Sequence, residues 1–535
     1  MITIRSMLSF SFVGKVIATL PRRLRKFAYV KTENMESVRF AALSACLLFM
    51  TVAGQTAAQS SYTITLEIEG LSHDTVYLAN YYGEKMFYAD TAITDGRGKA
   101  VFEGRAYEQC GKFAAVIPGP KFFDFLAVEE DIHIKTKAAQ PVAFIEVVAS
   151  EENRLFYDYL KFLQDKRTEA TPHEQVMQDS TASEEEKASA REILMAMGAD
   201  VEAEQRRIVA EHGNMLFAKY LSMVLEPEIP EIPGIANADE LRYRMYRDMY
   251  WKRVDFQDPR LVHDGSFNRI LDVYLNQVIP QSPDTVLNEV VNLVERARGN
   301  DEMFKYILHF ATFNAESSAI MCMDKVFVEL VNRYYKRGEA TWLNEDQLSK
   351  ITNRADELAP TVCGSRVPDI ILPGLDQTTW ESLYDLNTKY TAVVIWESTC
   401  GHCKKELPKI QELYEEWKDK GLSIFAIGND FEPEPWQEFV EKKDLSEWVH
   451  VSDNPAINNQ DSAMVLISQG ITTLESLNFR TTFDVFATPK IFLLDREKVV
   501  VAKQIGAEQL FEILTKLEDM EANGVLQPMR KTEEQ

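Results

Sequence analysis

Residues 396–408 read WESTCGHCKKELP, and two residues separate the cysteines of this stretch, Cys400 and Cys403. Redox-active dithiols, one half of many zinc sites and some structural crosslinks all use this spacing. The apolar run at residues 392–396 predicts a buried strand, and helical periodicity follows the cysteines. We expect the strand to end at Thr399 and the helix to begin near Cys400. A helix N-terminus lowers the pKa of a thiol, because its unpaired N–H groups and its dipole stabilise the thiolate.

These three chemistries make different demands on the rest of the chain. A zinc ribbon needs a second pair of ligands, and the chain has neither a second CxxC nor an HxxxH sequence. A structural disulfide at this spacing closes too short a loop to stabilise the fold much. A peroxidatic cysteine would need Thr or Ser three residues earlier, where the chain has Glu397. The pattern therefore favours a dithiol in which Cys400 attacks a disulfide and Cys403 resolves the mixed disulfide.

The composition restricts the class of protein and of partner. The chain has 535 residues, of which 45% are hydrophobic and 26% charged, as expected for several globular domains with buried cores. The net charge is −25, whereas binding to nucleic acid or to an anionic membrane needs a basic surface. We therefore expect neither nucleic acid nor a membrane surface as the main partner.

The first 58 residues have the features of an export signal. Within residues 35–58, Arg39 supplies a positive charge, residues 40–52 form an apolar core and residues 56–58 are small enough for cleavage. The apolar core is too short to span a bilayer as a stable helix. No later segment is apolar enough to do so, and the mature chain is therefore expected to be a periplasmic protein without a transmembrane span, in a compartment where disulfides persist.

Two details of this leader bear on its processing. Residues 1–34 are interpreted as an upstream extension, with Met35 as the true start. Residues 43–46, LSAC, match a lipoprotein cleavage box, but the apolar run continues past Cys46. Lipid anchoring through Cys46 is therefore the less favoured alternative.

The periodicity of the chain changes twice after the leader. Residues 61–145 contain short alternating runs and turn signals, which predict an antiparallel β sandwich. Residues 150–360 have helical periodicity and predict an all-α region. Residues 361–525 alternate strand and helix, which predicts an α/β domain with a mainly parallel sheet, and residues 526–535 form a polar tail.

At this point a family resemblance is clear. The stretch at residues 396–408 resembles the active-site segment of the TlpA/ResA-like branch of the thioredoxin superfamily. Residues 365–375 resemble the entry strand of that family, and residues 486–495, FATPKIFLLD, resemble its cis-proline strand. The resemblance covers residues 361–525 and implies a thioredoxin fold. The strand-rich and helical regions resemble modules fused ahead of such domains in Gram-negative bacteria.

The resemblance also assigns roles to individual residues. Cys400 and Cys403 match the family dithiol, and Glu406 matches a buried glutamate that relays protons to and from it. Burial would raise the pKa of such a carboxyl toward a useful range, although a surface helix carboxylate is the alternative. Pro489, after Thr488, matches the cis-proline whose loop offers backbone groups to an extended substrate and keeps metals off the dithiol.

Other residues of this segment complete the expected site. Trp396 and His402 are expected to contact the substrate, and His402 can add a positive charge or a hydrogen bond. Neither a metal nor an organic cofactor is expected. Two features depart from the family pattern: Thr399 stands where Trp is frequent, and residues 458–479 are longer than usual, either as a lid or as surface decoration.

These observations predict an extracytoplasmic thiol–disulfide oxidoreductase that reduces protein disulfides and maintains cell redox homeostasis, with a membrane electron donor. The Gly-His dipeptide between the cysteines resembles that of disulfide isomerases, so an isomerase or oxidant stays open. A binding or scaffold protein of the cell envelope, with a minor thioredoxin-like domain, is the second alternative. Whether Cys110, Cys322 and Cys363 form disulfides stays open as well.

Overall fold

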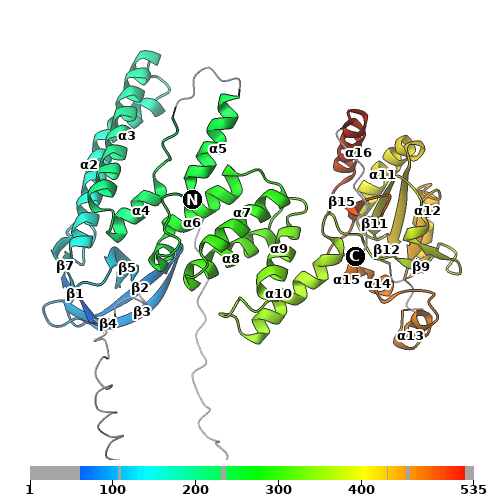
Figure 1. Ribbon diagram of the computed structural model, residues 1–535, viewed down its shortest axis with the longest axis horizontal. Coiled ribbons are helices and arrows are strands. Elements are labelled where there is room, and N and C mark those ends of the chain that lie inside the picture. The colour runs from blue at the N-terminus through cyan, green and yellow to red at the C-terminus, as the bar shows by residue number, and fades with distance from the viewer. Residues whose placement is uncertain (1–60, 106–109, 231–236, 431, 454–457, 525–535) are drawn as a thin grey trace, which may run out of the picture. The chain divides into compact units, whose positions relative to one another are not determined.

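The computed structural model describes residues 61–105, 110–230, 237–430, 432–453 and 458–524 (Figure 1). The expected leader with its cysteine, and the expected polar tail, lie outside these residues. Within the described part of the chain, no helix is both long enough and apolar enough to cross a lipid bilayer.

Two four-stranded sheets form the N-terminal region of the described chain, in the orders β4-β1-β7-β8 and β3-β2-β5-β6. Alternate side chains of β1, such as Ile64 and Leu66, share one buried core with Phe113 and Phe125 of the second sheet. One pairing differs from the expected antiparallel pattern, because β1 and β7 run parallel, with Ile64 opposite Ile132. The strands are β1 (Ser61–Glu69), β2 (Thr75–Tyr82), β3 (Lys85–Ile93), β4 (Lys99–Arg105), β5 (Gly111–Ile117), β6 (Lys121–Ala127), β7 (Ile132–Lys137) and β8 (Glu146–Ala149).

Helices make up the middle region. The longest begin at strong caps: the Ser183 side chain accepts from the Glu186 N–H, and the Glu186 carboxylate accepts from the Ser183 N–H. The α-helices are α2 (Glu151–Gln178), α3 (Glu184–His212), α4 (Leu216–Val224), α5 (Ala238–Tyr250), α6 (Gly265–Val273), α7 (Pro283–Arg296), α8 (Asp301–Glu316), α9 (Asp324–Leu330) and α10 (Glu345–Leu358). Single turns of other helix types are η1 (Pro259–His263), η2 (Tyr274–Val278), η3 (Val331–Tyr335) and η4 (Ala359–Thr361).

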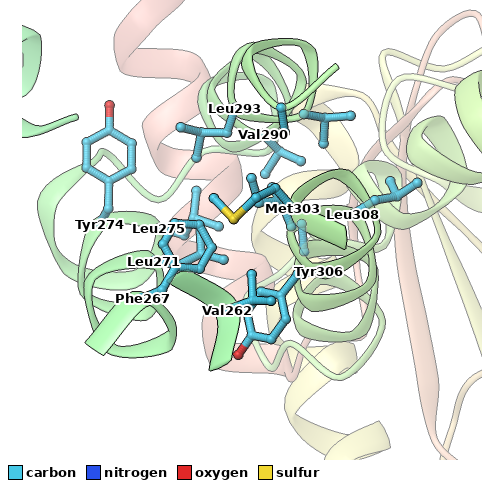
Figure 2. Packing of buried hydrophobic residues seen from close by; sticks show 14 of the residues in the cluster. Val262, Phe267, Leu271, Tyr274, Leu275, Val290, Leu293, Met303, Tyr306 and Leu308 are labelled. Atoms are coloured by element: carbon cyan, nitrogen blue, oxygen red, sulfur yellow. The ribbon is translucent and has the colours of Figure 1, made fainter. Parts of the chain in front are cut away.

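The apolar faces of these helices form one core. Figure 2 shows Met303 of α8 among side chains from the neighbouring helices, including Leu271 and Leu275 on one side and Val290 on the other. Met303 and Val290 are completely buried. Tight apolar packing of this kind dominates the stability of helical folds. The core of the middle region also includes Leu126 of β6.

A disulfide bond joins Cys322 to Cys363 across 41 residues of sequence. Cys322 lies in the turn between α8 and α9, and Cys363 lies at the start of the C-terminal domain, where it packs against the core of that domain. Lys503 of that domain is buried next to this bond, where its ammonium group pairs with Asp324 and donates to the Thr361 carbonyl. The disulfide and the ion pair both link the helical region to the domain that follows it.

The C-terminal region has a five-stranded sheet in the order β13-β12-β11-β14-β15, in which β11, β12 and β13 run parallel and β14 and β15 antiparallel to their neighbours. Its strands are β11 (Tyr390–Trp396), β12 (Leu422–Gly428), β13 (Val449–Ser452), β14 (Lys490–Asp495) and β15 (Val500–Lys503), and a separate hairpin has β9 (Ile371–Pro373) and β10 (Trp380–Ser382). The helices are α11 (Cys403–Trp417), α12 (Pro433–Lys442), α13 (Gln460–Ser468), α14 (Leu474–Leu477), α15 (Phe479–Thr482) and α16 (Ala507–Ala522), with single turns η5 (Leu383–Asp385) and η6 (Lys418–Lys420).

Strand β11 is buried along its whole length, because both faces of the sheet are covered. Val394 and Trp396 face a core that contains side chains of α11, α12 and α16. Val393 and Ile395 face the opposite core, which contains side chains of β9, α14 and α15. The expected fold class, with N-terminal sheets, a helical middle and a C-terminal thioredoxin-like α/β domain, is confirmed.

One edge of this sheet brings together segments that are far apart in sequence. The parallel strands β11 and β12 end side by side, with Trp396 opposite Gly428. Strand β14 is antiparallel to β11 and therefore begins at the same edge, with Lys490 opposite Ile395. The segments after β11 and β12 and the loop before β14 consequently meet at this edge, and it is here that the two cysteines lie.

Candidate active site

The two neighbouring cysteines lie at the start of α11. Strand β11 ends at Trp396, three residues before the expected end at Thr399, and the helix begins at Cys403, three residues after the expected start at Cys400. Cys400 therefore lies in the turn before the helix. The backbone N–H of Cys403 donates to the sulfur of Cys400 at 3.3 Å. Cys400 is partly exposed, whereas Cys403 is completely buried. The turn therefore presents one sulfur to solvent and keeps the other inside.

The surroundings of the two thiols move their pKa values in opposite directions. Burial alone would raise the pKa of Cys400, but hydrogen bonds from Cys403, from Thr488 and from the His402 backbone outweigh it and hold that pKa below its usual range. Burial, followed by the hydrogen bond with Cys400, raises the pKa of Cys403 to about 12. Cys400 is consequently the thiol that ionises first, and Cys403 stays protonated beside it.

A buried aspartate holds the turn that carries Cys400. The carboxylate of Asp430, just after β12, accepts from the backbone N–H of Ser398 at 3.0 and 3.2 Å and from its hydroxyl at 2.5 Å. Both residues are less than one-tenth exposed. Asp430 was not identified from the sequence as part of the site. Its position could have indicated this role, because it is the second residue after β12, a central strand that ends at the same edge of the sheet as β11.

The loop before β14 packs against the sulfur of Cys400. The bond between Thr488 and Pro489 is cis, and the thiol of Cys400 donates to the Thr488 carbonyl at 3.3 Å. The base of the loop is closed by an ion pair of 3.3 Å between Asp484 and Lys490, both buried. The expected proline loop and the dithiol are therefore in contact, and a backbone carbonyl lies beside the sulfur.

Glu406 differs from what the resemblance implies. Its side chain is half-buried, its carboxylate accepts from the Ala507 N–H at 3.1 Å, and it pairs with Lys409 at 3.1 Å. Burial would raise its pKa, but the Ala507 N–H and Lys409 outweigh burial and lower it. The expected deep burial and raised pKa are therefore wrong, because Glu406 meets the N-terminus of α16, where unpaired N–H groups favour a charged carboxylate.

The expected substrate contact of Trp396 is also wrong. Its side chain is completely buried and packs against Phe439, with ring centroids 5.1 Å apart. A central strand covered on both faces sends this residue into the core, so it supports the site from beneath and cannot touch a substrate. His402 and Thr399, by contrast, are exposed in the turn around Cys400.

The long segment before the proline loop is more than surface decoration. Its second half enters the core, where Phe479 is completely buried. Directly after the segment, Arg480 of α15 pairs with Asp453 at 2.7 Å and donates to the Asn429 side chain at 2.6 Å, so it bridges the ends of β13 and β12. Its first half, α13, has an exposed side chain in Met464. The end of this segment and Arg480, which follows it, therefore support the edge of the sheet at which the cysteines lie.

No group of three or more His, Cys, Asp or Glu side chains placed to hold a metal ion is found in the described ranges.

Two family models match the chain. Residues 363–503 match the AhpC/TSA family, and residues 168–359 match a family described as "Domain of unknown function (DUF5106)". The first match contains the dithiol and the proline loop, and the second contains most of the helical region.

Curated relatives match the C-terminal part. The thiol-disulfide oxidoreductase ResA of Bacillus cereus (strain ZK / E33L) is 29% identical over 157 residues, which are 29% of this chain and 78% of that protein. The protein of the same name from Oceanobacillus iheyensis is 32% identical over 100 residues, which are 18% of this chain and 52% of that protein. The expected resemblance to the ResA-like branch is confirmed by these relatives.

Solved structures similar to the chain include a domain of a possible thiol-disulfide isomerase from Cytophaga hutchinsonii, with 30% identity, a TM-score of 0.25, and coverage of 31% of this chain and 99% of that one. A thioredoxin-like protein from Bacteroides caccae has 20% identity, a TM-score of 0.37, and coverage of 54% of this chain and 98% of that one. With the family match and the topology of the sheet, residues 363–503 form a thioredoxin-like α/β domain that is similar to the AhpC/TSA family and to thiol-disulfide oxidoreductases.

Proposed function

We propose that the chain exchanges thiols and disulfides with protein substrates through the Cys400–Cys403 pair, and that it acts mainly as a reductase. One observation carries the proposal: a partly exposed thiol with a lowered pKa lies against a proline loop, directly beside a buried thiol whose pKa is raised. A lowered pKa supplies the thiolate that attacks, and a protonated neighbour waits to resolve the product.

The first step forms a mixed disulfide. The Cys400 thiolate attacks one sulfur of a substrate disulfide, the substrate S–S bond breaks, and the departing substrate thiolate takes up a proton. An extended substrate chain would lie along the loop at Thr488, whose carbonyl is 3.3 Å from the Cys400 sulfur. Once Cys400 ionises, the N–H of Cys403 remains as a donor to the sulfur, which favours the thiolate.

The second step releases the substrate. Cys403 loses its proton, and its thiolate attacks the Cys400 sulfur, so that the mixed disulfide breaks and the second substrate thiol leaves. The substrate disulfide has gained two electrons, and the Cys400–Cys403 pair is left as a disulfide. For a further cycle the pair needs two electrons from another dithiol, and we propose a membrane protein as that donor.

Glu406 is proposed as the group that accepts the Cys403 proton, since it lies one helical turn beyond Cys403 on α11. Its lowered pKa makes it a weaker base than the resemblance implies. Its contribution to the rate is therefore expected to be smaller than that of a buried carboxylate tuned for proton transfer.

We propose the periplasm as the site of action, because the leader has the pattern of an export signal and the Cys322–Cys363 disulfide suits an oxidising compartment. A fusion of the first 58 residues to a reporter that is active only outside the cytoplasm tests this. Activity of the fusion is expected, and an inactive fusion with full expression would contradict export.

An isomerase or oxidant is the second candidate, favoured by the stabilised Cys400 thiolate. Stabilising the reduced form of a dithiol makes its disulfide more oxidising. The two candidates differ in a direct assay with the pre-reduced chain. A reductase reduces insulin in repeated turnover with an added dithiol donor, whereas an isomerase restores activity to a scrambled disulfide-containing protein faster than it reduces insulin.

A further inference from the structure

Phe486 is unusually exposed for its residue type. Its side chain is 83% exposed, more than any other large hydrophobic side chain in the described ranges. It lies at the tip of the loop that runs from Asp484 to Lys490, and the ion pair between these two residues closes the base of that loop. The ring is thus exposed to solvent on a loop whose two ends are joined by the ion pair between Asp484 and Lys490.

The loop that carries this ring also contacts the sulfur of Cys400. Two residues after Phe486, the Thr488 carbonyl lies 3.3 Å from the sulfur of Cys400. Consecutive Cα atoms are about 3.8 Å apart, so the Cα atoms of Phe486 and Thr488 are at most about 8 Å apart. The backbone that carries the ring is therefore within about 8 Å of the backbone that contacts the sulfur of Cys400.

A residue of the helical region holds the ring and the loop together. The guanidinium of Arg354, on α10, lies 5.5 Å from the centre of the Phe486 ring. The same guanidinium forms an ion pair with Asp484. Arg354 thus contacts both the base and the tip of the loop, and it covers part of the ring with a planar cation.

We propose that Phe486 is a specificity-determining residue that binds an apolar side chain next to the cysteine of a protein disulfide, and that Arg354 is a positioning residue for it. The proposal rests on the proposed function and adds a substrate class to it. Contact with an apolar side chain removes this ring from water, which favours binding, and exposed aromatic residues near the centre of an interface often dominate it.

Exposed apolar side chains are common on protein surfaces, and exposure alone carries no function. Tyr88 on β3 is 73% exposed, for example, and lies in a different region from the dithiol. Phe486 differs from Tyr88 in three respects. Its loop contacts the sulfur of Cys400, an ion pair joins the two ends of that loop, and the guanidinium of Arg354 lies over its ring. Tyr88→Ala is for this reason the matched control.

The test compares two peptide disulfides that differ in one residue. Each is a homodimer of a short peptide, with Leu beside the cysteine in one and Asp in the other. The full chain is reduced beforehand, and the second-order rate constant of its reaction with each peptide is measured. The ratio of the two constants, Leu over Asp, reports selectivity and is insensitive to a uniform loss of folded protein.

Phe486→Ala is expected to lower this ratio roughly tenfold, as removal of an aromatic anchor from an interface often does. Arg354→Gln is expected to lower the ratio by a smaller factor, and Arg354→Lys, which keeps the charge, is expected to restore part of it. The Tyr88→Ala ratio is expected to equal that of the wild type. An unchanged ratio in Phe486→Ala would overturn the proposal.

Failure of the inference and failure of the proposed function give different results. If the wild-type chain reduces neither peptide faster than Cys400→Ser does, the proposed function fails. If the wild-type chain reduces both peptides but Phe486→Ala keeps the wild-type ratio, the specificity role alone fails. A low ratio in Phe486→Ala with a wild-type ratio in Arg354→Gln would remove the positioning role of Arg354.

Discussion

The Cys400–Cys403 pair and the Cys322–Cys363 pair differ in spacing, surroundings and chemical state. The first pair is a dithiol separated by two residues at the start of a helix. The second is a disulfide that spans 41 residues and joins the helical region to the domain that follows it. A disulfide between Cys400 and Cys403 would close a very short loop, so its formation would change the entropy of the unfolded chain little. The Cys322–Cys363 disulfide closes a long loop and therefore restricts the unfolded chain more.

We propose that this difference separates a reactive pair from a structural one. Around Cys400, N–H and hydroxyl donors stabilise a thiolate, which is the form that exchanges. Beside Cys322, the buried Lys503 pairs with Asp324, and this ion pair links the same two regions as the disulfide. One chain thus contains a pair suited to repeated exchange and a pair suited to holding two regions together.

The largest expected effect is loss of exchange on removal of the attacking sulfur. Cys400→Ser is expected to lower the rate of insulin reduction by roughly 1,000-fold or more, because serine supplies no thiolate. Cys403→Ser is expected to accumulate a mixed disulfide with the substrate, visible by mass spectrometry. The double variant Cys322→Ser/Cys363→Ser is the control and is expected to keep exchange. Full activity of Cys400→Ser would remove the distinction between the two pairs.

The second effect is on stability and concerns the structural pair. Removal of a disulfide that closes a loop of 41 residues is expected to lower the free energy of unfolding by up to about 4 kcal/mol. Urea denaturation of Cys322→Ser/Cys363→Ser measures this loss, and Cys400→Ser/Cys403→Ser is the matched control with little expected change. Equal stability of the two double variants would show that the long-range bond does not hold the regions together.

The third effect is on the pH dependence of alkylation. The rate of Cys400 alkylation by iodoacetamide is expected to rise with pH and to reach half its maximum below the usual pKa of a cysteine, because the thiolate reacts. Thr488→Val removes a donor to the sulfur and is expected to move this midpoint to higher pH. Thr481→Val, at an exposed position, is the control. A midpoint in the wild-type chain at or above the usual value would contradict the donor network.

The smallest expected effect is at Glu406. Glu406→Gln is expected to slow the resolving step by roughly tenfold or less, against the 10²–10⁴-fold typical of a general base. Lys409→Met removes the ion pair without removing the carboxylate and is the control. Stopped-flow measurement of substrate release from the mixed disulfide gives the rate. A loss of roughly 1,000-fold in Glu406→Gln would show that the carboxylate is the main base despite its lowered pKa.

Much of the C-terminal domain could be predicted because its signals are local. A continuous apolar run marked β11, and the cysteine spacing with the following helical pattern marked the dithiol. The loop at Pro489 was found through a family motif, since a proline alone does not indicate a cis bond. These features depend on short stretches of sequence.

The features that were missed depend on contacts between distant segments. The Cys322–Cys363 bond needs two turns to meet across 41 residues, and no local pattern encodes that meeting. The pKa of Glu406 depends on the N-terminus of a helix that begins a hundred residues later, at Ala507. The hydrogen bonds from Ser398 to the Asp430 carboxylate likewise form only because β11 and β12 end side by side.

The most direct test of the central claim is the reduction potential of each cysteine pair in one sample. The full chain is equilibrated in graded thiol buffers, free thiols are trapped with a mass tag, and tags are counted on the peptides of each pair. We predict about −270 mV for Cys400–Cys403, as for thioredoxin, and below about −300 mV for Cys322–Cys363, as for structural disulfides. A value near −180 mV for Cys400–Cys403 would contradict a reductase, and a long-range pair that reduces more readily than the dithiol would contradict the division between a reactive and a structural pair.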